Sequence, residues 1–305
     1  MRRSYRVLFG AIAVTGFVIV GPAVGLGVST AGAAPVQGYT CSGGAVNNPT
    51  PIPAGTYGSV TVTGICAVGG AVEIHGGLTV ASNAGLLATD PTAPDGNGGI
   101  ICTPVHLDVS GGIRVLSNGV LFLGDSLRQG GGTGCPTSHD VVNGGLTGLG
   151  SNSVVVHGTT INGGFSLNGG GGGNSYFQFP FGLFCANIMV GGLDAGTPPF
   201  SDVEDSWVNG GASISGLQTC WMGFINNQVN GGATVNNNTL GDPDAIEIGL
   251  NTIHGGLACS GNQRDPNSHI LPDDGSGGVP TNSFDGSPPN PNTVTGQETG
   301  QCAGL

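Results

Sequence analysis

A Gly-Gly pair recurs along this chain in a constant setting, and that repeat limits the possible folds more than any other feature. In each copy, the residue two positions before the first glycine and the residue two positions after it are apolar. Glycine is abundant, at 62 of 305 residues, but it lacks the three-residue period of collagen. The copies are residues 74–78, 109–113, 142–146, 161–165, 189–193, 208–212, 229–233 and 253–257, with a degenerate ninth at 294–296.

Each copy has the two-residue periodicity of a β-strand with one buried face. First glycines are 19, 21 or 24 residues apart in the closest copies, and the 35 residues between Gly76 and Gly111 leave room for a loop. Because one short strand per coil cannot bury its apolar face alone, the copies must stack at about 4.8 Å. The residue four positions after the first glycine is usually apolar as well: Val80, Val115, Leu167, Ile214 and Val235.

The repeat therefore predicts an all-β protein, a right-handed parallel β-helix (β-solenoid) of about eight to nine coils. The competing all-β fold is an antiparallel sandwich, but a sandwich would not align one column of residues per coil. Glycine in a recurring interior position suits a place where neighbouring backbones approach closely.

A second column of the repeat consists of short polar side chains, four residues before the first glycine. Such side chains can bond to backbone groups at a turn, so we interpret the column as structural. His75 and His254 stand in the slot just before the first glycine, which holds Ser110 and Asn143 in other copies, and we interpret them in the same way. The polar column is Asp140, Thr159, Asn187, Ser206, Asn227, Asn251 and Asn292.

The start of the chain predicts export. Arg2, Arg3 and Arg6 precede an apolar stretch over residues 7–28 and a run of small residues. We expect residues 1–33 to be a cleaved signal peptide rather than a membrane anchor. The general secretory route is the default, and Arg2-Arg3 is the sign of the alternative twin-arginine route.

The rest of the chain divides into three parts. Residues 34–57 are expected to form an N-terminal cap, which protects the open end of a stacked sheet. Residues 58–305 are expected to form the β-helix. Within it, the Pro-, Asp- and Gly-rich residues 263–291 predict a long loop.

Charge excludes two classes of partner. After the signal peptide, the basic residues are Arg114, Arg128 and Arg264, with no lysine, against eighteen acids, so the net charge is −15. Such a chain repels nucleic acid and anionic lipid. Acidity of this kind is typical of a soluble protein outside the cell, which predicts an extracellular or cell-wall-associated location.

The eight cysteines all follow the signal peptide, which fits an oxidising compartment and four disulfides. The sequence contains no Cys-x-x-Cys motif, the pattern that would indicate zinc or redox chemistry. Pairing of nearest neighbours would close loops of one or two coils, and Cys302 is expected to fasten the last coil to Cys259. The cysteines in order are Cys41, Cys66, Cys102, Cys135, Cys185, Cys220, Cys259 and Cys302.

Two acidic groups are candidates for chemistry. Asp202 and Glu204 alternate along one strand, so their carboxylates share a face and could form the pair of a glycosidase, while Asp205 should face the other way. The second group, beside a proline turn, offers oxygen ligands for calcium: Asp242, Asp244 and Glu247. A solvated acidic surface is the alternative for both.

A lyase acting on uronates needs cations to stabilise an enolate, and three scattered arginines supply them poorly.

A separate aromatic cluster follows a glycine run and forms either a satellite core or an exposed binding strip. It consists of Tyr176, Phe177, Phe179, Phe181 and Phe184.

Residues 251–262 and 291–302 resemble uncharacterised secreted proteins of actinobacteria, over about a fifth of the chain. More broadly, the repeats resemble right-handed β-helix proteins of the pectin-lyase-like superfamily. The pectinase motifs, which combine aspartates with histidine and arginine or lysine, have no match here, so the resemblance implies the fold and no activity.

The sequence thus favours a secreted, non-catalytic solenoid that contacts carbohydrate or another cell-surface polymer and needs no cofactor. The alternative is a glycoside hydrolase or polysaccharide lyase that uses Asp202 and Glu204, with calcium as a possible ion. The ligand and the oligomeric state are not readable from the sequence.

Overall fold

The computed structural model describes residues 36–45, 47–94, 100–126, 135–172, 175–179, 182–186, 200–241, 246–266, 280–283 and 288–305. The expected signal peptide lies outside them, and the chain from Pro35 to Leu305 forms one compact unit. Strands and turns make up the described residues, which contain no helix. In particular, this part of the chain has no helix with the length and apolar character needed to cross a membrane.

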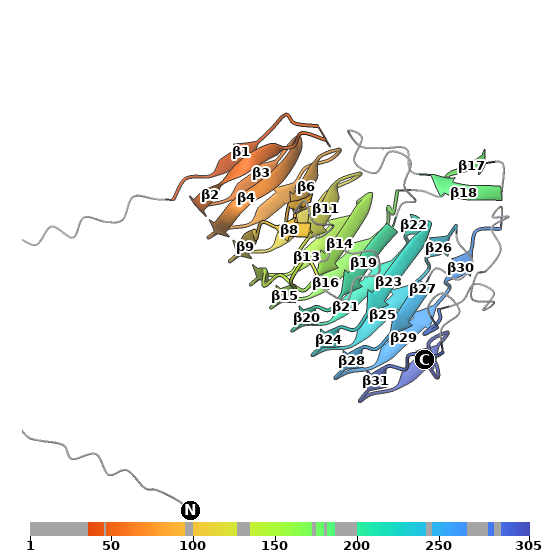
Figure 1. The fold of residues 1–305 in the computed structure, drawn as a ribbon. Helices are drawn as coiled ribbons and strands as arrows, with labels where there is room; N and C mark the ends of the chain where they lie inside the picture. Colours follow the sequence, from red (N-terminus) through yellow and green to blue (C-terminus); the bar gives the residue numbers. More distant parts are fainter. Residues whose placement is uncertain are drawn as a thin grey trace, which may run out of the picture. The chain divides into compact units, whose positions relative to one another are not determined.

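Successive coils stack in parallel, as the glycine repeat predicts, and the coils contribute strands to three rows (Figure 1). The first row is a ten-stranded sheet whose strands follow the glycine pairs. In stacking order its strands are β1 (Tyr39–Cys41), β3 (Val60–Val62), β5 (Leu78–Val80), β10 (Ile113–Val115), β13 (Leu146–Leu149), β16 (Phe165–Asn168), β21 (Ala212–Ser215), β25 (Ala233–Asn236), β29 (Leu257–Ser260) and β32 (Glu298–Gly300).

The second and third rows belong to one 15-stranded sheet, joined by the long strand β4 (Ile65–Ile74) with β2 (Thr50–Tyr57) beside it. The second row continues with β6 (Gly85–Ala88), β11 (Val120–Leu123), β14 (Ser153–His157), β19 (Phe200–Glu204), β23 (Trp221–Ile225) and β27 (Ile246–Gly249). The third row is β9 (His106–Val109), β12 (Val141–Val142), β15 (Thr160–Ile161), β20 (Trp207–Val208), β24 (Gln228–Val229), β28 (Thr252–Ile253) and β31 (Thr293–Val294).

Three smaller sheets complete the described strands. The last coils gain a short extra side made of β22 (Gln218–Thr219), β26 (Thr239–Leu240) and β30 (Gln263–Arg264). Two antiparallel hairpins extend from the stack. They are β7 (Thr92–Pro94) with β8 (Ile100–Cys102), and β17 (Ser175–Phe179) with β18 (Gly182–Ala186).

The glycine pairs lie over one another where the third row turns into the first. A Cβ atom on Gly111 would lie 2.6 Å from the Gly76 carbonyl oxygen, so no larger residue fits there without displacing backbone. The residues two positions before the glycines, such as Ile74 and Val142, are fully buried. They join the apolar residues of the first row in one continuous core along the stack.

The described residues of the polar column bond from coil to coil, as predicted, and all of them except Asn292 are buried. Asn227 Oδ1 accepts a hydrogen bond from the Ser206 backbone N–H at 3.1 Å, and Asn251 Oδ1 accepts one from the Asn227 N–H at 2.9 Å. The side-chain amide of Asn251 donates to the Phe224 carbonyl oxygen. These bonds satisfy backbone groups that a turn would otherwise leave unpaired in the interior.

Two other polar ladders emerge from the stack. The residues before the glycine pairs form an exposed amide ladder in which Asn162 donates to Asn143 at 2.8 Å. A second buried column, which the sequence did not predict, runs through Asn238 and Asn262 to Gln301.

One expectation about the coils needs correction. Strand β15 pairs directly with β20, and β16 directly with β21, so no coil lies between these strands, where the repeat predicted one. That copy and Asn187 lie outside the described residues. A glycine pair between apolar residues does not by itself require a strand, which explains the error. Within the segment expected to form the N-terminal cap, β1 pairs in parallel with β3, and β2 pairs in parallel with β4.

The predicted pairing of neighbouring cysteines is confirmed for three disulfides: Cys41–Cys66, Cys102–Cys135 and Cys259–Cys302. Cys220 is also in a disulfide, whereas the Cys185 side chain lies outside the described residues. Cys259 and Cys302 hold the last coil, as expected.

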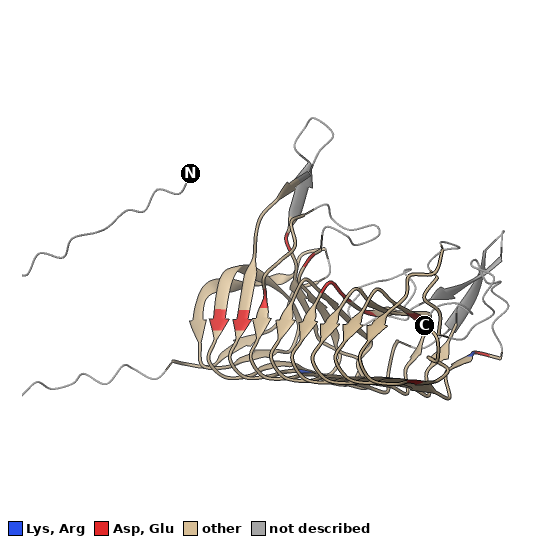
Figure 2. Cartoon of the chain, turned by 90° about the horizontal axis from the view of Figure 1, so that it is seen from below, with Lys and Arg blue, Asp and Glu red and all other residues tan. Residues whose placement is uncertain are grey.

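Figure 2 shows the coils along the stack, with few charged segments among them.

Candidate functional site

The turn between the second and third rows carries non-glycine residues in the left-handed backbone conformation. Asp205, Asn226 and Leu250 occupy it in three successive coils with the left-handed φ angles 49°, 53° and 60°. Asp and Asn tolerate this conformation, but a leucine pays roughly 1–2 kcal/mol for it. Non-glycine strain of this kind is often found at functional sites.

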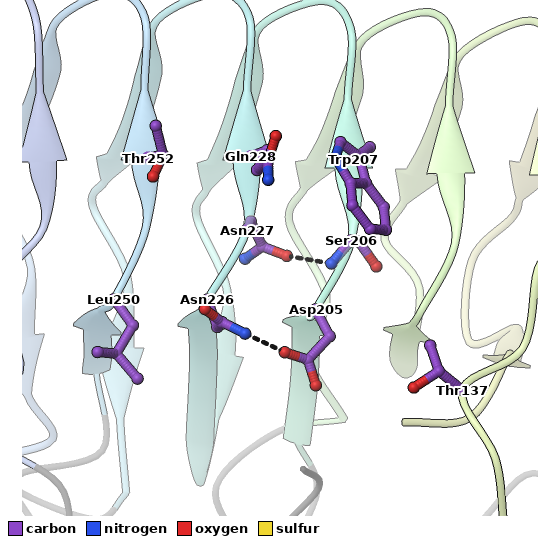
Figure 3. A pocket seen from close by; sticks show the side chains of 9 residues that line it. All are labelled: Thr137, Asp205, Ser206, Trp207, Asn226, Asn227, Gln228, Leu250 and Thr252. Atoms are coloured by element: carbon purple, nitrogen blue, oxygen red, sulfur yellow. Dashed lines mark hydrogen bonds between the residues drawn. The ribbon is translucent and has the colours of Figure 1, made fainter. Parts of the chain in front are cut away.

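A groove of about 430 Å³ runs across these turns and the start of the third row (Figure 3). Trp207, Gln228 and Thr252 occupy one register position on β20, β24 and β28 and line one side of it. Asp205, Asn226 and Leu250 line the other side. The remaining lining residues are Thr137, Ser206 and Asn227.

The groove gathers exposed apolar side chains. Among the described residues, five large apolar side chains are exposed, and two of them, Trp207 and Leu250, line the groove. Trp207 is 44% exposed. An indole left open to solvent beside amide and hydroxyl groups offers an apolar surface and hydrogen-bonding partners to the same ligand.

Asp205 is fixed in the wall of the groove. Its two carboxylate oxygens accept hydrogen bonds from the Ser126 hydroxyl and the Asn226 side-chain amide. The sequence predicted that Asp205 would face the other way from Asp202 and Glu204, and this is wrong. Its left-handed backbone ends the strand alternation at Glu204 and turns Asp205 to the surface groove.

The predicted acid pair lies on the outer face of β19, beside a histidine from β14. Asp202 is 4% exposed and His157 is 1% exposed, and Asp202 Oδ2 lies 2.9 Å from His157 Nε2. Strand pairing brings His157 level with Glu204. One donor atom from each of Asp202, Glu204 and His157 lies within 4.8 Å of the others.

Electrostatics in this cluster disfavour charge on Glu204. Burial raises the pKa of Glu204 well above its usual range. The charge of Asp202, a hydrogen bond with Asp202 and the charges of Asp205 and Glu247 raise it further. A positive charge nearby would oppose this rise in the pKa of Glu204.

The second predicted acidic group falls mainly outside the described residues. Asp242 and Asp244 lie there, so the calcium site that they would form stays a prediction. Glu247 lies on β27, level with Gly223 of β23 and Asp202 of β19. It thus shares a row with the first acidic pair.

The backbone of the aromatic segment forms the β17–β18 hairpin, and Phe181 and the aromatic side chains lie outside the part of the chain that the structure describes. The sequence reasoning missed His157 and Trp207. Both were detectable from the polar column, since His157 and Glu204 stand two residues before Thr159 and Ser206, and Trp207 stands one residue after Ser206.

The fold and the groove define a parallel β-solenoid with a ligand-sized groove on its outer face. No family model matches the chain, and neither a curated protein nor a solved structure matches it. The expected relationship to pectin-lyase-like and actinobacterial proteins therefore stays a prediction.

Proposed function

We propose that this chain is a secreted, non-catalytic solenoid that binds a neutral polysaccharide along the groove beside Trp207. The observation that carries the proposal is the 44% exposure of Trp207 in a groove otherwise lined mainly by amides and hydroxyls. Sugar rings present apolar C–H faces and polar edges, and this lining complements both.

The regular spacing of the coils supports an extended ligand. Trp207, Gln228 and Thr252 repeat at the same register position on three paired strands, so their side chains are separated by about 4.8 Å per coil. That distance is comparable to the advance of one sugar in an extended polymer. Successive sugars could therefore meet equivalent positions on successive coils.

Charge favours a neutral ligand. The chain carries no lysine, and the groove contains the carboxylate of Asp205. An anionic polymer such as a polyuronate would meet repulsion from this carboxylate and from the acidic chain as a whole.

The burial of Asp202, one member of the acid pair, argues against the enzymatic alternative. A glycosidase carboxylate must contact the glycosidic bond, but Asp202 is 4% exposed and lies beneath the surface. A glycosidase uses a pair of carboxylates, and the residues that line the groove include a single acid, Asp205. Disulfides are compatible with the proposed location outside the cell.

Binding to insoluble neutral polysaccharides tests the proposal. The protein is incubated with cellulose, chitin, β-1,3-glucan or a neutral galactan, and the bound fraction is measured by sedimentation. We expect at least one polymer to bind, with affinity reduced about two- to tenfold in Trp207→Ala, because stacking on an aromatic ring contributes on the order of 0.5–1.5 kcal/mol.

The matched control is Leu149→Ala. Leu149 is 45% exposed, as open as Trp207, but lies on the first row outside the groove. It should bind like the wild type. Equal losses in the two variants, preference for polygalacturonate, or release of reducing ends from the bound polymer would each reject the proposal.

A further inference from the structure

The cluster of His157, Asp202 and Glu204 lies apart from the groove lining and is unused by the proposed function. It combines one imidazole and two carboxylates from two neighbouring strands, β14 and β19. Both strands have their backbone groups fixed in a parallel sheet. The three side chains are therefore held on a rigid base, as a binding site requires.

One atom of the cluster lacks a partner in the interior. Asp202 Oδ2 lies 2.9 Å from His157 Nε2, but Asp202 Oδ1 is buried and has no hydrogen-bond partner. An ionised oxygen in this position is costly unless a donor or a cation meets it. Two carboxylates and one imidazole lie close together in this cluster, so a cation would complement it.

The next strand leaves space for the unpartnered oxygen. Gly223 of β23 is level with Asp202, and a Cβ atom there would lie 2.4 Å from Asp202 Oδ1 and 2.5 Å from the Trp221 ring. A side chain at position 223 would therefore displace the carboxylate. Glycine at this position keeps the Asp202 carboxylate where it is, close to both other donors.

We propose that His157, Asp202 and Glu204 bind a divalent transition-metal cation, with Zn²⁺ as the best match. Imidazole nitrogen with carboxylate oxygens is a donor set that zinc accepts, whereas calcium and magnesium prefer oxygen ligands alone. Three protein ligands leave a position for water. Partly exposed Glu204 forms the side of the site that is open to solvent.

The spacing of the three donors suits this cation after small side-chain rotations. Bonds of about 2.1 Å to a tetrahedral ion place ligand atoms about 3.4 Å apart. The three donor atoms are now within 4.8 Å of one another. His157 Nε2 would give its lone pair to the metal instead of sharing a proton with Asp202.

Metal binding to the purified full protein tests the proposal. After treatment with a chelator, the protein is titrated with Zn²⁺ by calorimetry, and bound metal is counted by elemental analysis. We expect stoichiometric binding that excess Ca²⁺ does not displace. Asp202→Asn and Glu204→Gln, which preserve shape, should each weaken binding at least about tenfold.

The control is His75→Gln. His75 Nε2 and Glu73 Oε1 form a comparable pair at 3.0 Å, but it is exposed. This variant should bind Zn²⁺ like the wild type. A wild type that binds no zinc would overturn the proposal and leave a proton shared between the acids, and equal binding by Asp202→Asn would overturn it too.

A spectroscopic readout covers the case in which a variant does not fold. In the wild type, Zn²⁺ should shift the imidazole nitrogen resonances of a single buried histidine in the nuclear magnetic resonance spectrum. Resonances that stay in place, or that shift only for exposed histidines, would contradict the site. Loss of polysaccharide binding in Trp207→Ala leaves this result unaffected, because Trp207 is not one of the proposed ligands.

Discussion

Gly144 lies directly against Gly111 of the preceding coil, so closely that a Cβ atom on Gly144 would be 2.5 Å from the Gly111 carbonyl oxygen. Within each pair the second glycine has somewhat more space than the first, although the space varies along the stack: a Cβ on Gly145 would be 2.9 Å from the Gly164 carbonyl oxygen, and a Cβ on Gly164 would be 3.3 Å from the Gly211 carbonyl oxygen. The first glycine therefore permits the closest approach of the backbones, and a second glycine such as Gly164 leaves room for a methyl group after a small shift.

Alanine substitution should reveal this difference in stability. Gly144→Ala forces backbone apart and should lower the free energy of unfolding by about 1–3 kcal/mol or more, as overpacking does. Gly164→Ala should cost less than about half as much, since only a small shift is needed. Urea unfolding followed by circular dichroism measures both. Equal losses would contradict the stacking of first glycines.

The buried and exposed asparagine ladders should also differ in energy. Asn251 accepts from the Asn227 N–H and donates to the Phe224 carbonyl oxygen, both inside the stack. Asn251→Ala leaves these groups unpaired and should cost about 2–5 kcal/mol. Exposed Asn209, which donates to Asn162 at 2.6 Å, can be replaced by water, so Asn209→Ala should cost less than about 1 kcal/mol. A larger loss for Asn209→Ala in thermal unfolding would refute this assignment.

Asp140 should make stability depend on pH. It is 1% exposed, and burial raises its pKa to about 6. A hydrogen bond from the Leu107 N–H, the charge of His106 and a hydrogen bond from Ser138 oppose this rise in pKa, while the charge of Asp90 adds to it. Because the unfolded chain has a pKa of about 3.9 at this residue, the native state holds the proton more tightly.

This difference in pKa sets the direction in which folding stability changes with pH. Protonated Asp140 favours the folded state fully below the unfolded pKa, and the contribution is lost as pH rises from about 4 through about 6, by up to about 3 kcal/mol. Asp140→Asn removes this dependence while keeping the acceptor oxygen. Urea unfolding at about pH 4 and about pH 7 should show a larger decrease for the wild type than for the variant. Identical pH profiles would show that Asp140 does not titrate in this range.

The repeat predicted the stack because its columns record the contacts between coils. Ile74 and Val142 are buried where the periodicity places them, and Asn227 bonds to Asn251 as the polar column requires. The same pattern could not show that β15 pairs directly with β20, because a glycine pair between apolar residues does not by itself require a strand. The position of a single residue within a coil can be predicted only when the register of every strand is known.

The candidate site was predicted in part for the same reason. Alternation along one strand placed Asp202 and Glu204 together, but His157 is 45 residues from Asp202 in the chain and reaches it only through the pairing of β14 with β19. The groove depends on the left-handed turn at Asp205, Asn226 and Leu250. A leucine in that conformation has no signal in the sequence, and strand alternation gave the wrong direction for Asp205.

The fluorescence of Trp207 tests the central claim most directly. The chain has two tryptophans, so Trp221→Phe leaves Trp207 as the reporter while keeping an aromatic ring beside Phe200. A bound neutral polysaccharide should shift the emission to shorter wavelength and protect it from acrylamide, because the sugar covers the indole. Unchanged emission and quenching in the presence of a polymer that binds the protein would show that the ligand lies elsewhere.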